Sequence, residues 1–248
     1  MRIKKKQHNL PFSVDDTVKI LHRNLDFTAT EQYKLLRTNL GFTLPIGEIC
    51  PVIGVTSSIR GEGKSTTSIN LSYVLAEKGY KVLLIDGDLR CPSIAKKMEI
   101  ERKKGLTDFL MGEFGDLDCF RSSLLENWYV IPSGIIPPNP SELLGSERMR
   151  ALLTEFRKSF DYIVIDLPPV NPVSDAVAVA DAITGMLVVI REDYINKKEL
   201  SSCFRQLELS HVKILGCVMN CAKYGQYSRY RYGMHKALPR KSERGIHD

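Results

Sequence analysis

The sequence contains no apolar run that approaches the roughly 18–20 residues needed to span a bilayer, and no signal peptide is visible. A membrane-spanning segment is therefore not expected. The six cysteines form no CxxC pair and have no companion histidines at zinc spacing. This pattern favours buried or incidental thiols in a reducing cytosol over a disulfide framework. No internal repeat is visible, and 248 residues suit one large α/β domain.

Acidic residues are absent from residues 1–14, which carry a charge of +4. Residues 222–248 carry +5, so the rest of the chain is mildly acidic at −3, although the total is +6. A nucleic-acid-binding fold needs a basic patch on its folded surface, so no nucleic-acid partner is expected. Two interpretations of the basic ends stay open: contact with an anionic membrane, or solvated termini that only improve solubility.

Apolar, β-branched segments alternate with segments of helical periodicity along most of the chain. The alternation predicts an α/β fold, a mostly parallel sheet with helices on both faces. We divide the chain into an N-terminal arm (1–27), one domain (28–221) and a flexible basic tail (222–248). The predicted strands cover residues 52–56, 81–86, 128–132, 161–166, 186–191 and 213–219. The predicted helices cover residues 64–78, 140–159, 175–181 and 196–210, with Asn139 as the cap of the second, and another helix runs from Thr30 to Pro45.

A glycine-rich segment follows the first predicted strand and opens the next helix. Backbone N–H groups of such a loop converge on phosphate oxygens, helped by the helix dipole. Lys64 would reach the β and γ phosphates, Ser65 would bind Mg²⁺, and Thr66 would lie near the α phosphate. The usual pattern has glycine where this chain has Ser58. The residues predicted to bind the nucleotide are Ser58, Arg60, Gly61, Glu62, Gly63, Lys64, Ser65 and Thr66. The alternative is a glycine loop with an incidental lysine.

Aspartates end two further apolar strands. Asp166 ends one of them, where an acid can hold Mg²⁺ through water or can simply cap the next turn. Asp86 and Asp88 end the other, and residues two apart in an extended segment point the same way. We expect these two carboxylates and Arg90 to line one side of the γ-phosphate, one acid orienting or deprotonating a hydroxyl while the other assists the metal. A solvent-exposed Asp-Gly turn is the alternative.

Four of the ten tyrosines fall within nine residues of the tail. They are Tyr224, Tyr227, Tyr230 and Tyr232. The surrounding residues have no apolar periodicity, so a packed helix or strand is not expected. The cluster is interpreted as a flexible phosphorylation substrate delivered to a neighbouring copy, with a sheet-edge or adhesive tail as the alternative.

Together the three motifs resemble Walker A, Walker A′ and Walker B of the bacterial tyrosine kinases and of their relatives, the partition and cell-division-site ATPases. Residues 31–40 resemble the kinase helix with an ExxRxxR motif for subunit contacts, represented here by Glu31, Lys34 and Arg37. Residues 136–144 are similar to the family's PPNPxELL segment, and residues 166–176 match its DxPP…DA pattern. Three departures stand out: Lys34 replaces an arginine, Arg60 a frequent proline, and Ile59 the signature lysine of the partition ATPases.

The resemblance implies an ATP-dependent protein-tyrosine kinase with a P-loop NTPase fold and Mg²⁺, in which Lys64, Asp86, Asp88 and Asp166 are catalytic. Metal binding would fall to Ser65, Asp86 and Asp166, and an adenine contact to Asn220. The resemblance also implies a cytoplasmic homo-oligomer, a ring, recruited to the membrane by an integral-membrane adaptor of capsule or exopolysaccharide synthesis. A cognate tyrosine phosphatase and polysaccharide-synthesis proteins as substrates would complete the set of partners. A positioning ATPase and a non-catalytic regulatory subunit are the alternative functions.

Overall fold

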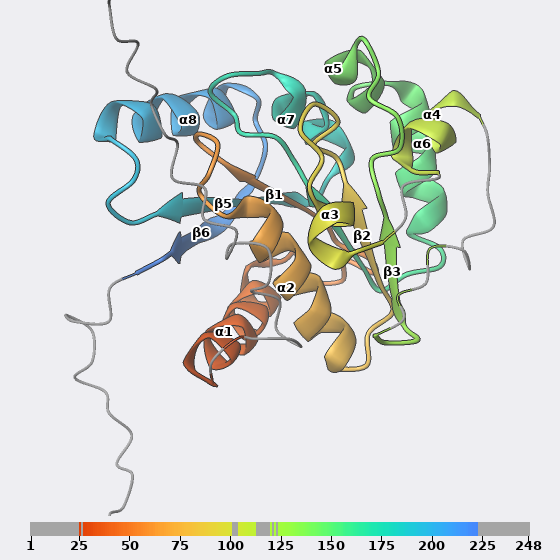
Figure 1. Cartoon of the computed structure of the whole chain (residues 1–248), viewed down its shortest axis with the longest axis horizontal. Coiled ribbons are helices and arrows are strands. Elements are labelled where there is room, and N and C mark those ends of the chain that lie inside the picture. Colours follow the sequence, from red (N-terminus) through yellow and green to blue (C-terminus); the bar gives the residue numbers. More distant parts are fainter. Residues whose placement is uncertain are drawn as a thin grey trace, which may run out of the picture.

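The computed structural model describes residues 25, 27–100, 104–112, 120, 122 and 124–222. Within them one parallel sheet has the strand order β3-β2-β4-β1-β5-β6 (Figure 1). The strands are β1 (Val52–Ser57), β2 (Val82–Asp86), β3 (Trp128–Ile131), β4 (Tyr162–Asp166), β5 (Gly185–Arg191) and β6 (Ile214–Asn220). All six predicted strands are confirmed to within a few residues. Strands β1 to β4 are buried along almost their whole length, and such apolar runs are a strong local signal, whereas β6 at the sheet edge is partly exposed.

The helices depart further from the expectation. They are α1 (Phe27–Thr43), α2 (Lys64–Glu77), α3 (Ile94–Met98), α4 (Leu106–Met111), α5 (Pro140–Leu144), α6 (Glu147–Phe156), α7 (Asp175–Ala178), the 3-10 turn η3 (Ala180–Ala182) and α8 (Lys197–Leu209). The helix predicted at 140–159 was wrong as one element: it divides into α5 and α6, because the Ser146 hydroxyl accepts the Met149 N–H and starts a new helix. Asn139 precedes α5, but its side chain makes no hydrogen bond to the backbone of that helix. The short α3 and α4 were not predicted.

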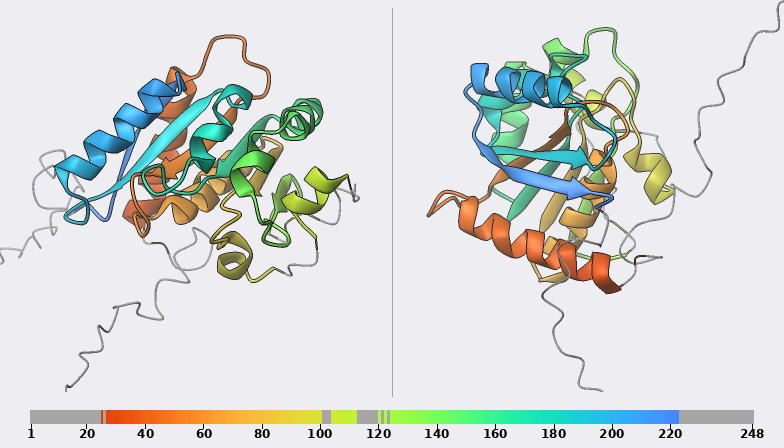
Figure 2. Two further views of the ribbon diagram at one scale, coloured as in Figure 1. Left: turned by 90° about the horizontal axis from the view of Figure 1, so that it is seen from above. Right: turned by 90° about the vertical axis from the view of Figure 1, so that its left-hand side faces the viewer.

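Helices cover both faces of the sheet. Figure 2 shows α1 and α2 on one side of the strands and α8 on the other. Alternating strand residues supply the two apolar layers: Val82 and Leu84 pack on the α1–α2 side, whereas Leu83 and Ile85 pack toward α6 and α8. No helix in the described part of the chain is long and apolar enough to cross a membrane.

Candidate nucleotide site

The predicted motifs meet at the carboxyl edge of the sheet, where open parallel sheets bind ligands. Strand β4 lies between β1 and β2, and Asp86 and Asp166 are register partners at the ends of β2 and β4. The glycine-rich loop leaves β1 beside them and enters α2 at Lys64. Parts of the chain 22 to 102 residues apart therefore converge because of the strand order.

Two glycines shape the loop. Gly61 and Gly63 have φ angles of 93° and 97°, a region that side chains with a Cβ rarely adopt. Gly63 directly precedes α2, so the loop closes against the N-terminus of a 14-residue helix. Lys64 and Ser65 are buried in its first turn, and Thr66 is half-buried. This arrangement aims a helix N-terminus at the space above the sheet, as a phosphate-binding loop requires.

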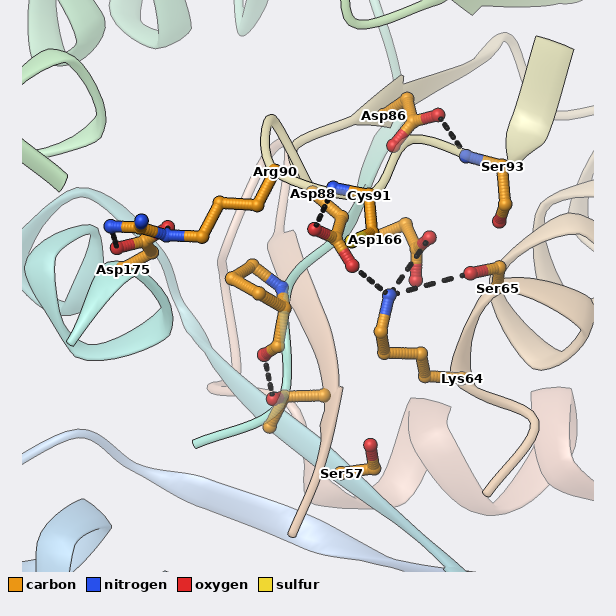
Figure 3. A network of polar contacts seen from close by, with 12 residues as sticks. Ser57, Lys64, Ser65, Asp86, Asp88, Arg90, Cys91, Ser93, Asp166 and Asp175 are labelled. Atoms are coloured by element: carbon orange, nitrogen blue, oxygen red, sulfur yellow. Dashed lines mark hydrogen bonds and ion pairs between the residues drawn. The ribbon is translucent and has the colours of Figure 1, made fainter. Parts of the chain in front are cut away.

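The Lys64 ammonium lies among acidic side chains (Figure 3). Its Nζ is 2.7 Å from Asp88 Oδ2, 3.6 Å from Asp166 Oδ2 and 3.4 Å from the Ser65 hydroxyl. Burial by itself would lower the pKa of Lys64, but the charges of Asp166 and Asp88 outweigh it, and the net change is upward. Lys64 is therefore a buried cation, and anionic groups hold it at the mouth of the loop.

Among the residues that the structure describes, Asp86 and Asp166 each have one carboxylate oxygen without a hydrogen bond. Asp86 Oδ2 accepts the N–H groups of Ser93 and Ile94 at 3.1 and 3.0 Å, while its Oδ1 is buried and unpartnered. Asp166 Oδ1 accepts the Ser68 hydroxyl at 3.1 Å, and its buried Oδ2 has no hydrogen-bond donor. Burial, followed by the charge of Asp166, raises the pKa of Asp86 to about 7. Burial also raises the pKa of Asp166.

The carboxylate oxygens without a hydrogen bond bear on whether the site suits a metal ion. Carboxylate oxygens and a hydroxyl are the ligands that Mg²⁺ prefers. Two buried carboxylate oxygens lack donors, and Ser65 lies within reach of Lys64, beside Asp166. Burial raises the pKa of both carboxyl groups and repulsion between the acids adds to it, and a divalent cation would offset both effects. The residues present therefore fit Mg²⁺.

The prediction that Arg90 lines the phosphate site with the two aspartates was wrong. Arg90 donates to both carboxylate oxygens of Asp175, at 2.7 and 3.0 Å, and points away from Lys64 (Figure 3). Asp175 is fully buried at the start of α7, so the guanidinium serves as its counter-charge. Asp88 instead points to Lys64, and its other oxygen accepts the Cys91 N–H at 3.0 Å. Asp175 belongs to the DA pattern seen in the sequence, but its partner could not be read from spacing.

Other predicted nucleotide residues have structural bonds within the loop. The Glu62 carboxylate is buried and accepts the N–H groups of Ile59 and Arg191, at 2.8 and 3.3 Å. Ser58 is also buried, whereas Arg60 is exposed. The Asn220 amide donates to the carbonyl of Glu62 at 2.8 Å, so this residue does lie on the loop. Its predicted contact with adenine stays a prediction.

The predicted oligomer contacts lie on α1. Lys34 pairs with Glu31 one turn away at 3.0 Å, on the exposed face. Arg37 instead donates to the Val74 carbonyl of α2 at 2.6 Å, which fastens α1 to the domain. The tyrosine cluster 224–232 and most of the N-terminal arm fall outside the described residues.

A parallel sheet, a glycine loop that enters a helix at a buried lysine, and aspartates at two neighbouring strand ends define a P-loop NTPase with an added two-aspartate motif. A protein-family model described as an AAA domain matches residues 51–214. Tyrosine-protein kinase YwqD of Bacillus subtilis (strain 168) is 37% identical over 178 residues, which cover 72% of this chain and 75% of the relative. The chain belongs to the bacterial tyrosine-protein kinase family.

Further similarities agree with this assignment. Tyrosine-protein kinase CpsD of Streptococcus pneumoniae serotype 4 is 39% identical over 176 residues, 70% of this chain and 77% of the relative. The kinase domain of Escherichia coli tyrosine kinase ETK superposes with a TM-score of 0.72 at 31% identity, covering 84% of this chain and 88% of that one. The cell-division ATPase MinD of Pyrococcus furiosus superposes less well, with a TM-score of 0.56 at 26% identity over 68% of this chain and 71% of that one.

Proposed function

We propose that the chain is an ATP-dependent protein-tyrosine kinase that phosphorylates the tyrosine cluster of its own tail in trans. The observation that carries the proposal is the set of three buried aspartates around Lys64, two of which keep an oxygen without a hydrogen bond among the described residues. A site that only binds nucleotide has no need for the pair Asp86 and Asp88 beside Asp166, whereas phosphoryl transfer to a hydroxyl needs both a metal site and a proton acceptor.

The roles follow from the contacts. Lys64 would transfer from Asp88 to the β and γ phosphates, and this exchange would free the Asp88 carboxylate. Asp88 would then accept the proton of the incoming tyrosine hydroxyl. The tyrosine oxygen would bond to the γ-phosphorus as the bond between that phosphorus and the oxygen of the departing ADP breaks. Ser65, Asp86 and Asp166 would hold Mg²⁺, which would neutralise phosphate charge when bound.

The wider setting is proposed on the family resemblance. The tail 222–248, which follows the domain 28–221, would present Tyr224, Tyr227, Tyr230 and Tyr232 to a neighbouring copy. A homo-oligomeric ring with Glu31, Lys34 and Arg37 at its contacts would bring active site and tail together. An integral-membrane adaptor would recruit the cytoplasmic kinase to the membrane, and with it the kinase would regulate capsule or exopolysaccharide synthesis. A tyrosine phosphatase would reverse the modification, and polysaccharide-synthesis proteins would be further substrates.

The test is intact-mass and phosphopeptide analysis after incubation with Mg-ATP, with and without the cytoplasmic peptide of the adaptor. Wild type should gain phosphate on the four tyrosines, and Lys64→Met should gain none. To test transfer in trans, two variants are mixed. One has an intact active site but all four tail tyrosines changed to phenylalanine, and the other is Lys64→Met with its tyrosines intact. Phosphate should then appear on the Lys64→Met chain.

Nucleotide hydrolysis with no phosphotyrosine, even with the adaptor peptide present, would favour a positioning ATPase similar to the cell-division ATPases. Ile59 already argues against that class, because the partition ATPases place their signature lysine at this position.

A further inference from the structure

Three consecutive carbonyl groups of the phosphate-binding loop are tethered from outside the loop. The Arg60 carbonyl accepts the Tyr194 hydroxyl at 3.2 Å. The Gly61 carbonyl accepts Arg191 Nη1 at 3.2 Å. The Glu62 carbonyl accepts the Asn220 amide at 2.8 Å. We call the three donors, Arg191, Tyr194 and Asn220, the carbonyl clamp.

The sheet order explains where the clamp comes from. The loop leaves β1, whose neighbour on one side is β4 and on the other β5, followed by β6. The ends of β4 and β2 supply the aspartates, whereas Arg191 and Asn220 are the last residues of β5 and β6. Tyr194 lies three residues beyond β5. The loop therefore lies between an acidic side with the three aspartates and a second side from which Arg191, Tyr194 and Asn220 bond to its carbonyl groups.

A tethered carbonyl fixes the direction of the next N–H group. The peptide unit is planar and trans, so the C=O of one residue and the N–H of the next point in opposite directions. Holding the carbonyls of Arg60, Gly61 and Glu62 outward therefore turns the N–H groups of Gly61, Glu62 and Gly63 to the other side of the loop. Within the described part of the chain these three N–H groups make no hydrogen bond, so they stay available to an anion.

The loop has little stiffness of its own. Gly61 and Gly63 are conformationally permissive, and Arg60 between them and the strand has no ring to restrict φ. The clamp is itself braced: the Arg191 guanidinium lies 4.9 Å from the centre of the Tyr194 ring, and the Arg191 N–H donates to the buried Glu62 carboxylate. Asn220 is packed so closely on Gly63 that a Cβ there would come within 2.0 Å of its amide nitrogen.

We propose that Arg191, Tyr194 and Asn220 are positioning residues that hold the peptide units of the loop in the orientation needed to bind nucleotide phosphates. The proposal rests on the proposed function, since it concerns the same nucleotide site. The clamp orders the loop before the nucleotide binds, so the entropy cost of ordering is not part of the binding free energy. Loss of the clamp should therefore weaken nucleotide binding more than it slows phosphoryl transfer from bound nucleotide.

Tyr194→Phe is the cleanest test, because it removes one hydroxyl donor and keeps the ring that Arg191 contacts. The expected result is a rise of about 3–10-fold in the Kd for Mg-ADP, measured by calorimetry, and a similar rise in KM for ATP, with kcat and Tm little changed. Tyr80→Phe is the matched control: Tyr80 as a residue is 39% exposed against 47% for Tyr194, and its ring packs on Tyr162 away from the loop. This control should leave the Kd unchanged.

Arg191 provides a second, independent variant. Arg191→Met removes the side-chain donor to the Gly61 carbonyl and should weaken Mg-ADP binding, whereas Arg191→Lys keeps a donor and should restore part of the affinity. If Tyr194→Phe and Arg191→Met bind Mg-ADP as tightly as wild type, the positioning role of the clamp is overturned and the proposed function is not affected. A wild-type chain that binds no Mg-ADP would overturn the proposed function, and the clamp with it. A loss of Tm that accompanies every loss of affinity would overturn a positioning role in favour of a structural one.

Discussion

At the scale of single residues, the site concentrates negative charge in a buried place. Asp86 and Asp166 are fully buried, and Asp88 is nearly so, around one lysine. Burying carboxylates with fewer cations than acids costs stability in the free protein, and a bound cation recovers it. The pKa of Asp86, about 7, records this cost.

The first prediction concerns pH. Folding raises the pKa of Asp86 from 3.8 to about 7, so the folded chain keeps a proton over a range in which the unfolded chain has released it. The free energy of unfolding of the metal-free protein should therefore fall, by about 1–3 kcal/mol, as pH rises from about 4 to about 7. Denaturant titrations with a chelator present measure it. Asp86→Asn cannot ionise but keeps an acceptor for Ser93 and Ile94, so its decline should be flatter; an equally steep decline would assign the effect to other groups.

The second prediction concerns Gly63. Gly63→Ala places a Cβ against the Asn220 amide, which must move and give up the Glu62 carbonyl. Gly79→Ala is the control, since Gly79 has a similar φ of 101° with no atom within 4 Å of the added Cβ. Both variants should lose about 1 kcal/mol of stability to backbone strain. Only Gly63→Ala should lose Mg-ADP affinity, by about tenfold or more, in calorimetry; equal affinities in the two variants would contradict this account.

At the scale of elements, one ion pair joins the loop after β2 to helix α7. Arg90 contacts both oxygens of the buried Asp175, 85 residues away. The same loop carries Asp88, the carboxylate proposed to accept the tyrosine proton, so the pair holds this loop as well as α7 in position. Its loss should therefore affect both stability and phosphoryl transfer.

The third prediction tests this pair. Arg90→Met leaves the buried Asp175 carboxylate without its cation, and we expect a loss of about 1–3 kcal/mol in unfolding free energy. This loss of stability should be smaller than that for a fully buried ion pair, because the Arg90 side chain is 43% exposed and solvent screens its charge. Arg150→Met breaks an exposed pair with Glu147, which solvent screens on both sides, and should cost much less stability than Arg90→Met. Thermal and denaturant unfolding compare the two, and similar losses would show that burial of Asp175 is not decisive.

At the scale of the whole molecule, charge is divided between a mildly acidic middle and basic ends. Residues 222–248 carry +5, and the nucleotide site is acidic. A tail that lies in the active site of a neighbouring copy would therefore help to hold an oligomer together. Each phosphate adds about −1.5 to −2, so four would bring about −6 to −8 and make the tail slightly negative.

The fourth prediction follows from this change of sign. Protein phosphorylated on the tail should sediment as a smaller species than unphosphorylated protein at low ionic strength, with the difference reduced by salt. The chain with all four tyrosines changed to phenylalanine, incubated with Mg-ATP in the same way, should keep the larger size. Identical sizes before and after phosphorylation would exclude the tail as an electrostatic tether.

The strands, the phosphate loop and the edge of the sheet at which they meet could all be predicted from the amino-acid sequence. These features are local: a strand buried on both faces must be apolar throughout, and a loop around phosphate needs glycine followed by lysine and a hydroxyl. Short helices such as α3 and α4 were missed because five or six residues carry too little periodicity.

The pairs of side chains that meet across the sheet could not be predicted, because they depend on how the strands are ordered in space. Arg90 was expected at the phosphate but binds Asp175. The arginine side chain is long enough to reach α7, and the fully buried Asp175 carboxylate requires a counter-charge. Arg191, Tyr194 and Asn220 reach the phosphate loop from 130, 134 and 158 residues away. That meeting depends on β1 lying between β4 and β5, an order set by the packing of the whole sheet and not by any segment of the chain.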